Sequence, residues 1–340
     1  MKQAVMVEPG KIEFRQVEKP TIQDGEILMQ TKRIGVCGSD IHVFHGKHPY
    51  TSYPVVQGHE VGGVVAEVGQ GVEGIAVGDK VTFTPQVVCG ECYPCQHGMY
   101  HVCEKLKVMG FQTGGAGQEY FVLPEWNVFK LPDDMTLEHA AMIEPVSVAV
   151  HAVRRGGDVT GKKVLVLGAG TIGNLVAQVA KAFGAQAVMI TDVNDYKLNK
   201  ATACQIDFAI NTARQDLDAA LLRNFGPDRA DLILECVGVQ PTVTQAVEYA
   251  RKGTTIVIVG VFGEKPVVNL GFVQDRELNL VGTAMYQKTD FEAAIESVTS
   301  GRIHLDELVT HHFAFDDYLQ AYHAIEQSHG EYMKVMIELD

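Results

Sequence analysis

The sequence has 340 residues, a length that predicts about two domains rather than one hydrophobic core. Hydrophobic residues make up 46% and charged residues 21%, which is typical of a soluble globular protein and excludes a disordered or collagen-like chain. Lysines and arginines number 28 against 42 aspartates and glutamates, and the resulting net charge of −14 argues against a nucleic-acid partner.

The N-terminal segment and the cysteines bear on the cellular compartment. The segment carries charges and Pro9 where a secretory signal needs an apolar core, and no apolar run reaches the roughly 18 residues of a membrane span. Four of the seven cysteines fall between Cys89 and Cys103, and such clustering in a cytosolic chain indicates metal before disulfides. We therefore expect a cytoplasmic, metal-binding protein with no membrane partner.

Residues 1–150 contain short β-like runs that are broken by glycine and proline. No long helical pattern interrupts them before Leu137–Met142, so this region predicts a compact, mostly β domain. The expected strands include Glu26–Thr31, Val61–Val68, Lys80–Phe83 and Glu119–Val122.

Residues 151–282 change to buried apolar strands that alternate with amphipathic helices. This alternation predicts an α/β fold with a doubly wound parallel sheet and right-handed crossovers. The expected strands are Lys163–Leu167, Ala187–Thr191, Phe208–Ile210, Asp231–Glu235, Thr255–Val259 and Leu278–Val281, and helices are expected over 172–183, 196–204, 216–225 and Val243–Tyr249. Residues 283–340 add two helical patterns and a final strand, KVMIEL, which we expect to return to the first domain and complete it.

A glycine-rich turn follows the first strand of this α/β region. Gly168, Gly170 and Gly173 form a G-x-G-x-x-G motif that opens a helix, and Asp192 ends the next strand nineteen residues after Gly173. The glycines allow a tight turn, close approach of a pyrophosphate and close helix–strand packing, while the helix N-terminus attracts phosphate. Asp192 would bind the adenosine ribose hydroxyls and repel a 2′-phosphate, so the motif predicts NAD rather than NADP. We interpret Lys197 as a residue that contacts the ribose or carries a solvated charge.

Four cysteines lie in one short segment. Cys89, Cys92 and Cys95 have C-x₂-C-x₂-C spacing, and Cys103 follows after seven residues. Four thiolates form a closed tetrahedral shell with no position for substrate, which predicts a structural zinc. Disulfides or free thiols are the alternative.

A second set of metal-ligand residues is dispersed along the chain. Cys37 is followed by Gly58-His59-Glu60 and later by Glu144-Pro145, which we interpret as the start of a helical stretch. One cysteine, one histidine and one carboxylate, with water or a second carboxylate in the fourth place, make a catalytic zinc shell with an exchangeable position. Ordinary buried core residues are the alternative.

The GHE motif with Gly63, Gly69 and Val72, together with the Cys37 segment, the four cysteines and GAGTIG in this order, resembles the zinc-dependent medium-chain alcohol dehydrogenases. The resemblance covers essentially the whole chain. Glu60 and Glu144 resemble the sorbitol/polyol and threonine dehydrogenase branch. The family resemblance implies a GroES-like β domain over 1–150, completed by 283–340, and a Rossmann domain over 151–282, with the active site in the cleft between them.

The resemblance also implies roles for individual residues. Cys37, His59 and Glu60 would bind the catalytic zinc, and Glu144 would bind it directly or through water. Ser39 and His42 would relay the proton that the substrate loses. Ile172, Asp192, Lys197, Val259, Val261 and Thr283 would contact the cofactor. The family is also typically a homotetramer or a dimer.

These features predict an enzyme with NAD and two zinc ions per chain, one catalytic and one structural. It would oxidise a secondary hydroxyl of a polyol, sugar acid or related polyhydroxy compound to the ketone. L-Threonine 3-dehydrogenase is one alternative, and a non-catalytic protein that binds NAD and zinc is another. The expected substrate pocket is polar; Met285-Tyr286 replaces the Arg-Tyr of sorbitol-type enzymes, and the candidate lining residues are His45, Lys47, His48, Tyr50, Tyr53, Phe111, Gln112, Met285 and Tyr286.

Overall fold

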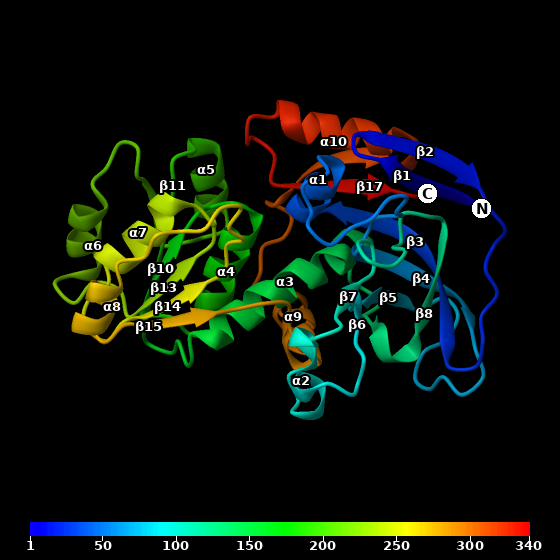
Figure 1. The fold of residues 1–340 in the computed structure, drawn as a ribbon, viewed down its shortest axis with the longest axis horizontal. Coiled ribbons are helices and arrows are strands. Elements are labelled where there is room, and N and C mark those ends of the chain that lie inside the picture. The colour runs from blue at the N-terminus through cyan, green and yellow to red at the C-terminus, as the bar shows by residue number, and fades with distance from the viewer. The chain divides into compact units, whose positions relative to one another are not determined.

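A computed structural model describes residues 1–340 and divides them into two compact units (Figure 1). The first unit comprises Met1–Glu144 and Val309–Asp340, and the second comprises Pro145–Leu308. None of the helices combines the length and the apolar character that crossing a bilayer requires.

The first unit is built on a seven-stranded sheet in the order β16-β17-β3-β4-β5-β9, with β8 paired to β3. Its core consists of alternate apolar residues of these strands, among them Ile27, Met29 and Phe83, which are essentially inaccessible to solvent. The sheet strands are β3 (Glu26–Val36), β4 (Glu60–Val68), β5 (Lys80–Phe83), β8 (Tyr120–Pro124), β9 (Val128–Lys130), β16 (Val309–Ala314) and β17 (Lys334–Glu338).

Smaller elements complete the first unit. β1 and β2 pair as an antiparallel hairpin, and β6 pairs with β7. Their bounds are β1 (Lys2–Glu8), β2 (Lys11–Gln16), β6 (Gln86–Val87), β7 (Lys107–Val108), α1 (Gly38–Phe44), α2 (Tyr93–Gln96), α10 (Tyr318–Gln327) and the 3₁₀ turns Tyr100–Val102, Glu125–Asn127 and Phe315–Asp317.

The C-terminal strand returns to the first unit, as expected from the sequence. β17 pairs antiparallel with β3, placing Met336 opposite Gly35, and it pairs parallel with β16. This return carries Lys334 to the strand end that precedes Cys37.

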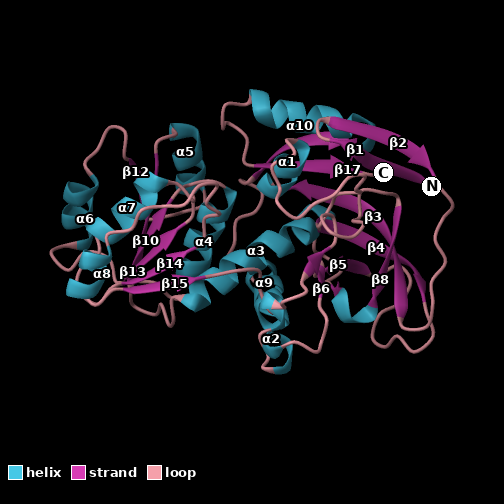
Figure 2. Cartoon of the chain, in the orientation of Figure 1, coloured by secondary structure: helices cyan, strands magenta, loops and turns pink.

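The second unit contains a six-stranded parallel sheet in the order β12-β11-β10-β13-β14-β15, flanked by helices (Figure 2). The predicted doubly wound sheet is therefore confirmed, and the central strands are buried on both faces. The strands are β10 (Lys163–Leu167), β11 (Ala187–Asp192), β12 (Phe208–Asn211), β13 (Leu232–Glu235), β14 (Thr255–Ile258) and β15 (Asn279–Gly282); the helices are α4 (Thr171–Ala182), α5 (Asp195–Ala203), α6 (Leu217–Phe225), α7 (Gln240–Glu248), α8 (Leu270–Asp275) and α9 (Lys288–Thr299).

Two features differ from the sequence-based expectations. Glu144-Pro145 does not begin a helix, because both residues lie inside the single helix α3 (Leu137–Arg155). Residues 283–308, expected to accompany the first domain, cluster with the second unit. The reason is visible at α9, whose Asp290 accepts hydrogen bonds from His151 Nδ1 and Arg154 Nη1 of α3, each at 2.7 Å.

Candidate metal centres and dinucleotide site

Cys37, His59 and Glu60 come together in the first unit although twenty-two residues separate Cys37 from His59. Cys37 caps the N-terminus of α1 at the end of β3, and Glu60 begins β4 directly opposite Gly35. One ligand atom from each of the three residues lies within 4.8 Å of the other two. A methyl group at Gly35 would lie 2.3 Å from Glu60 Oε2, so the absence of a side chain at Gly35 leaves room for this carboxylate.

Asp40 supports His59 from behind, a role that sequence reasoning missed. His59 Nδ1 faces Asp40 Oδ1 at 3.6 Å, and both side chains are buried. Burial acts to lower the pKa of His59, but the Asp40 carboxylate and the Cys37 sulfur outweigh it and raise that pKa well above its ordinary value. Asp40 is itself held by Gln57 Nε2 at 3.1 Å and by the Cys37 backbone N–H at 2.9 Å. A carboxylate behind a histidine is the usual arrangement that orients a metal ligand.

Lys334 is a second residue that sequence reasoning missed. Its Nζ donates to Glu60 Oε1 at 2.7 Å and to Oε2 at 2.5 Å, and it also reaches the Val36 carbonyl at 3.2 Å. Burial acts to lower the pKa of Lys334, yet the charges of Glu60 and Cys37 prevail and raise it. The carboxylate of Glu60 is therefore charge-paired inside the protein and is held beside the Cys37–His59 pair.

The other predicted residues of this centre occupy different places. Ser39 and His42 both lie on α1, Ser39 half-buried in its first turn and His42 exposed in its last turn. Glu144 is buried in α3, and its charge acts on Lys334, but its carboxylate does not join the three-residue cluster.

The four cysteines of the second motif also converge. Sulfur separations are 3.4 Å for Cys89–Cys103, 3.7 Å for Cys92–Cys103 and 4.0 Å for Cys89–Cys95. Zinc–sulfur bonds of about 2.3 Å in a tetrahedron place sulfurs about 3.8 Å apart, which the observed spacings match. All four cysteines are free of disulfides. Backbone N–H groups of Glu91 and Cys92 lower the pKa of the Cys89 thiol to about 6, which favours the thiolate that metal requires.

The glycine-rich turn joins β10 to α4 in the second unit. Gly168 has a φ of 100°, a conformation that favours glycine, and a methyl group there would lie 2.4 Å from Val237 Cγ2. Gly170 caps α4, and a methyl group on it would meet no atom within 4 Å. Open space over Gly170, at a helix N-terminus, fits a pyrophosphate group.

Two alanine substitutions separate packing from phosphate approach in this turn. Gly173→Ala places a methyl group 1.9 Å from the Gly168 carbonyl oxygen and is expected to destabilise the protein by about 1–3 kcal/mol in urea unfolding. Gly170→Ala should unfold like the parent, because its methyl group meets no protein atom, but it should weaken NADH binding at least about tenfold in a fluorescence titration. Unaltered NADH affinity of Gly170→Ala would argue against a pyrophosphate here.

Asp192 ends β11 beside this turn. Its Oδ2 accepts from the Ala169 N–H at 2.9 Å, and its Oδ1 accepts from the N–H groups of Val193 and Asn194. The carboxylate is thus fixed at the carboxyl edge of the sheet, where dinucleotides bind in open α/β folds. The other predicted cofactor residues share this edge or the helices that start from it: Ile172 lies in the first turn of α4, Lys197 lies in the first turn of α5, Val259 and Val261 follow β14, and Thr283 follows β15.

Glu235 organises the neighbouring loops and was missed by sequence reasoning. This residue is fully buried at the end of β13, and its Oε1 accepts from Val237 N, Gly238 N and Thr242 Oγ1. Its backbone carbonyl accepts from Val259 N and Gly260 N. A methyl group at Gly260 would lie 2.1 Å from Gly238 N, so the loops after β13 and β14 pack backbone to backbone. The signal available in the sequence was an acidic residue ending the apolar run LILE.

The candidate substrate residues fall into several groups. His45 pairs with Glu326, and the Tyr53 hydroxyl donates to the Val43 carbonyl, so both are engaged within the fold. Tyr286 is fully buried beside Phe291, and Met285 precedes it with a φ of 52°. His48 stacks on Phe111, whereas Lys47 and Tyr50 are exposed and Gln112 Nε2 donates to the Tyr50 carbonyl at 3.4 Å.

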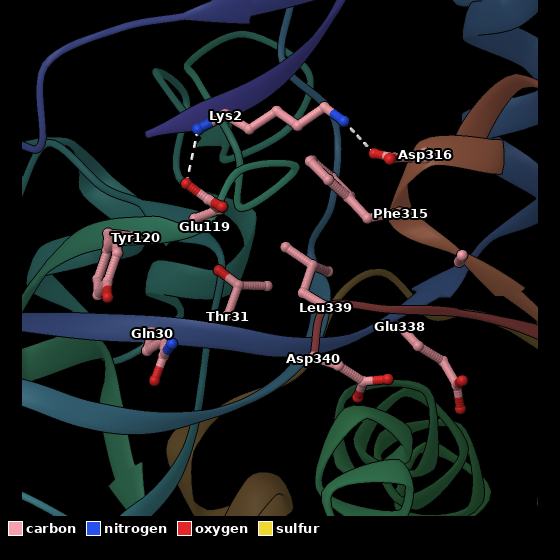
Figure 3. A pocket seen from close by; sticks show the side chains of 11 residues that line it. Lys2, Gln30, Thr31, Glu119, Tyr120, Phe315, Asp316, Glu338, Leu339 and Asp340 are labelled. Carbon is pink, nitrogen blue, oxygen red and sulfur yellow. Dashed lines mark hydrogen bonds and ion pairs between the residues drawn. The ribbon is translucent and has the colours of Figure 1, made fainter.

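A separate pocket of the first unit holds none of these residues. Figure 3 shows Lys2 donating from its backbone N–H to Glu119 and from Nζ to Asp316. Its other polar lining residues are Gln30, the buried Thr31, Tyr120, Glu338 and Asp340. Because it contains none of Cys37, His59 and Glu60, none of the four clustered cysteines and no residue of the glycine-rich turn, this pocket is distinct from the candidate sites described above.

Comparisons with known proteins agree with this geometry. The chain matches the family described as alcohol dehydrogenase GroES-like domain over residues 23–133 and the family described as zinc-binding dehydrogenase over residues 171–300. A 2-dehydro-3-deoxy-L-galactonate 5-dehydrogenase of Pseudoalteromonas atlantica is 38% identical over 304 residues, which cover 88% of this chain and 89% of that protein. A sorbitol dehydrogenase of Halalkalibacterium halodurans is 34% identical over 343 residues, covering 99% of each.

A solved structure supports the same assignment. A protein described as short chain alcohol dehydrogenase (rspB) from Escherichia coli CFT073, crystallised with NADH, superposes with a TM-score of 0.92 at 32% identity, covering 100% of this chain and 99% of that one. The predicted GroES-like and Rossmann folds are thereby confirmed. The chain belongs to the zinc-binding medium-chain alcohol dehydrogenase family and is a zinc-dependent NAD(P) oxidoreductase.

Proposed function

We propose that this protein oxidises a secondary hydroxyl of a polyol, sugar acid or related polyhydroxy compound to the ketone, with NAD as the hydride acceptor. The observation that carries the proposal is the convergence of Cys37, His59 and Glu60 donor atoms within 4.8 Å. The names of the relatives support the substrate class, since one acts on a deoxygalactonate derivative and another on sorbitol.

The donor sets fit two zinc ions per chain. Cys37, His59 and Glu60 leave an exchangeable position, as a catalytic site needs. We propose that Glu144, whose charge acts on Lys334, serves this site through water. Cys89, Cys92, Cys95 and Cys103 fill a closed structural shell. Bound zinc would make a substrate hydroxyl more acidic, and bound NAD would accept the hydride.

Residues of the chain itself would orient the metal ligands, balance their charge and transfer the proton. Asp40 orients His59, and the Lys334 ammonium group pairs with the negative charge of the Glu60 carboxylate. The Ser39 hydroxyl would take the proton of the substrate, and His42, exposed one turn along α1, would release it to solvent. The alcohol thus loses one proton and one hydride and becomes a ketone.

Asp192 favours NAD over NADP. Its carboxylate is fixed by three backbone N–H groups at the edge where the adenosine ribose would lie. A ribose 2′-hydroxyl can donate to it, whereas a 2′-phosphate would place like charges together. We further propose that Ile172, Lys197, Val259, Val261 and Thr283 line the cofactor.

A screen of NADH formation tests the proposal. We expect turnover with polyols, aldonates or inositols, and at least tenfold higher kcat/KM with NAD than with NADP. Turnover with threonine alone would favour the alternative threonine dehydrogenase, for which Glu60 and Glu144 are equally suitable. Oxidation of simple primary alcohols only would count against both, and a protein that binds NADH and zinc without any turnover would be the non-catalytic alternative.

We also propose a cytoplasmic homotetramer or dimer. The second unit supports assembly because β15 is an edge strand and because Val261, Val267 and Leu270 are 84%, 77% and 68% exposed. An unpaired strand edge and exposed apolar side chains are each typical of a surface that binds another chain.

A further inference from the structure

We propose that His48 determines specificity by binding a substrate hydroxyl remote from the one that is oxidised. The inference rests on the proposed function, because it concerns how a polyhydroxy chain is held once its reacting carbon lies at the Cys37–His59–Glu60 centre. His48 lies on the segment between α1 and β4, in the same unit as that centre.

Three rings in series connect His48 to the centre. The imidazole of His48 lies flat on Phe111, with ring centroids 4.8 Å apart and planes 7° apart. Phe111 is buried and contacts the ring of His59, again with centroids 4.8 Å apart. The two imidazoles can therefore be no farther apart than twice this distance.

The separation suits a polyol. Each carbon–carbon bond of about 1.5 Å advances an extended chain by roughly 1.3 Å, so five or six carbons span roughly 5–6.5 Å. A chain of this length that begins at the zinc-ligand cluster reaches toward His48 with its distal hydroxyls.

The chemistry of His48 also suits a hydroxyl. Its Nδ1 is bonded to Thr51 Oγ1 at 2.7 Å, and Nε2 has no hydrogen-bond partner within the protein. Burial, with a further contribution from His42, lowers the pKa of His48, which favours the neutral ring at pH 7. A neutral imidazole offers one donor or acceptor at Nε2, which matches a hydroxyl rather than a carboxylate. Phe111 and Thr51 hold the ring in place, which reduces the entropy lost on binding.

His48→Phe tests the inference, because it keeps the stacking and removes Nε2. With a hexitol or aldonate that the parent oxidises, we expect KM to rise about tenfold with kcat changed less than about twofold. With 2-butanol, which has no further hydroxyl, KM should stay the same. Calorimetric titration of the NADH-loaded enzyme with the polyol should show the same tenfold loss of affinity, independently of turnover.

His311→Phe is the matched control. His311 also stacks on an aromatic ring, Tyr332, also bonds a threonine Oγ1 through Nδ1, and also has a pKa lowered by burial, but it lies on β16 outside the centre. Its variant should leave both substrates unaffected. His48→Gln, which keeps a hydrogen-bonding group, should recover part of the polyol affinity and replaces His48→Phe if that variant does not fold.

The outcomes separate this inference from the proposed function. A parent enzyme that oxidises polyols while His48→Phe keeps its polyol KM overturns the role of His48 alone. An equal rise in KM for 2-butanol also overturns it, because the effect is then not on a distal hydroxyl. A parent that oxidises no polyhydroxy compound overturns both.

Discussion

Lys334→Met is expected to destabilise the protein by about 3–5 kcal/mol in the absence of zinc. Removing one partner of a buried ion pair leaves the other charge uncompensated in a medium of low polarity. Glu60 would be that charge: the side chains of Lys334 and Glu60 are only 4% and 1% exposed, and Nζ donates to both carboxylate oxygens. Urea unfolding of the parent and the variant, each after chelation of metal, measures the difference.

An exposed pair in the same unit supplies the control for this prediction. Lys19 Nζ meets Glu67 Oε1 at 2.7 Å, with exposures of 43% and 48%, so Lys19→Met should change the free energy of unfolding by at most about 1 kcal/mol. Because Glu60 is also a proposed zinc ligand, adding zinc should recover part of the stability that Lys334→Met loses. Equal effects of the two lysine variants would mean that the buried pair contributes no more than a surface one.

The dinucleotide half of the molecule could be predicted from the sequence because its signals are local. Strand β10 occupies Lys163–Leu167, the run that was predicted, since a strand buried on both faces has a continuous apolar sequence. The turn, the helix start at Gly170 and the acidic residue ending β11 all fall within 25 residues of one another.

The supporting residues of the candidate metal centre could not be predicted in the same way. Lys334 is 274 residues from Glu60, and only the pairing of β17 with β3 brings them together. Asp40 stands in the Cys37 motif itself, but its partner His59 is placed by the register of β4 against β3. Strand register depends on the whole sheet, so a single sequence does not disclose such partners.

Local signals also misled at α3. We expected a helical stretch to begin at Glu144-Pro145, and proline is common in the first turn of a helix. Helix α3 begins at Leu137, where the sequence already shows a helical pattern, and continues through Glu144-Pro145 without a break; its residues Ala140–Ile143 are completely buried. Burial of this apolar face outweighs the hydrogen bond that Pro145 cannot donate.

Cys37→Ser is expected to lower kcat at least about a thousandfold while the protein keeps its fold and one of the two zinc ions that we propose. The serine hydroxyl is nearly the same shape as the thiol, but it does not ionise at neutral pH and is a poor zinc ligand. The proposed catalytic shell would therefore lose a ligand beside His59 and Glu60, and the substrate hydroxyl would lose its activation. Zinc content, circular dichroism and NADH formation, measured on one preparation, check the three parts of this prediction.

Cys103→Ser is the matched variant, because it changes the same atom in the other cluster. Cys103 is buried, and its sulfur lies 3.4 Å from Cys89 and 3.7 Å from Cys92. A structural zinc contributes directly to folding free energy, so this variant should also retain one zinc but melt roughly 10 °C lower and be cut by protease near residues 89–103. If Cys37→Ser loses turnover but not stability, the Cys37–His59–Glu60 cluster is catalytic. If Cys103→Ser loses stability but not turnover, the four-cysteine cluster is structural. If Cys37→Ser kept both zinc ions and full turnover, the metal-dependent mechanism proposed for Cys37, His59 and Glu60 would be wrong.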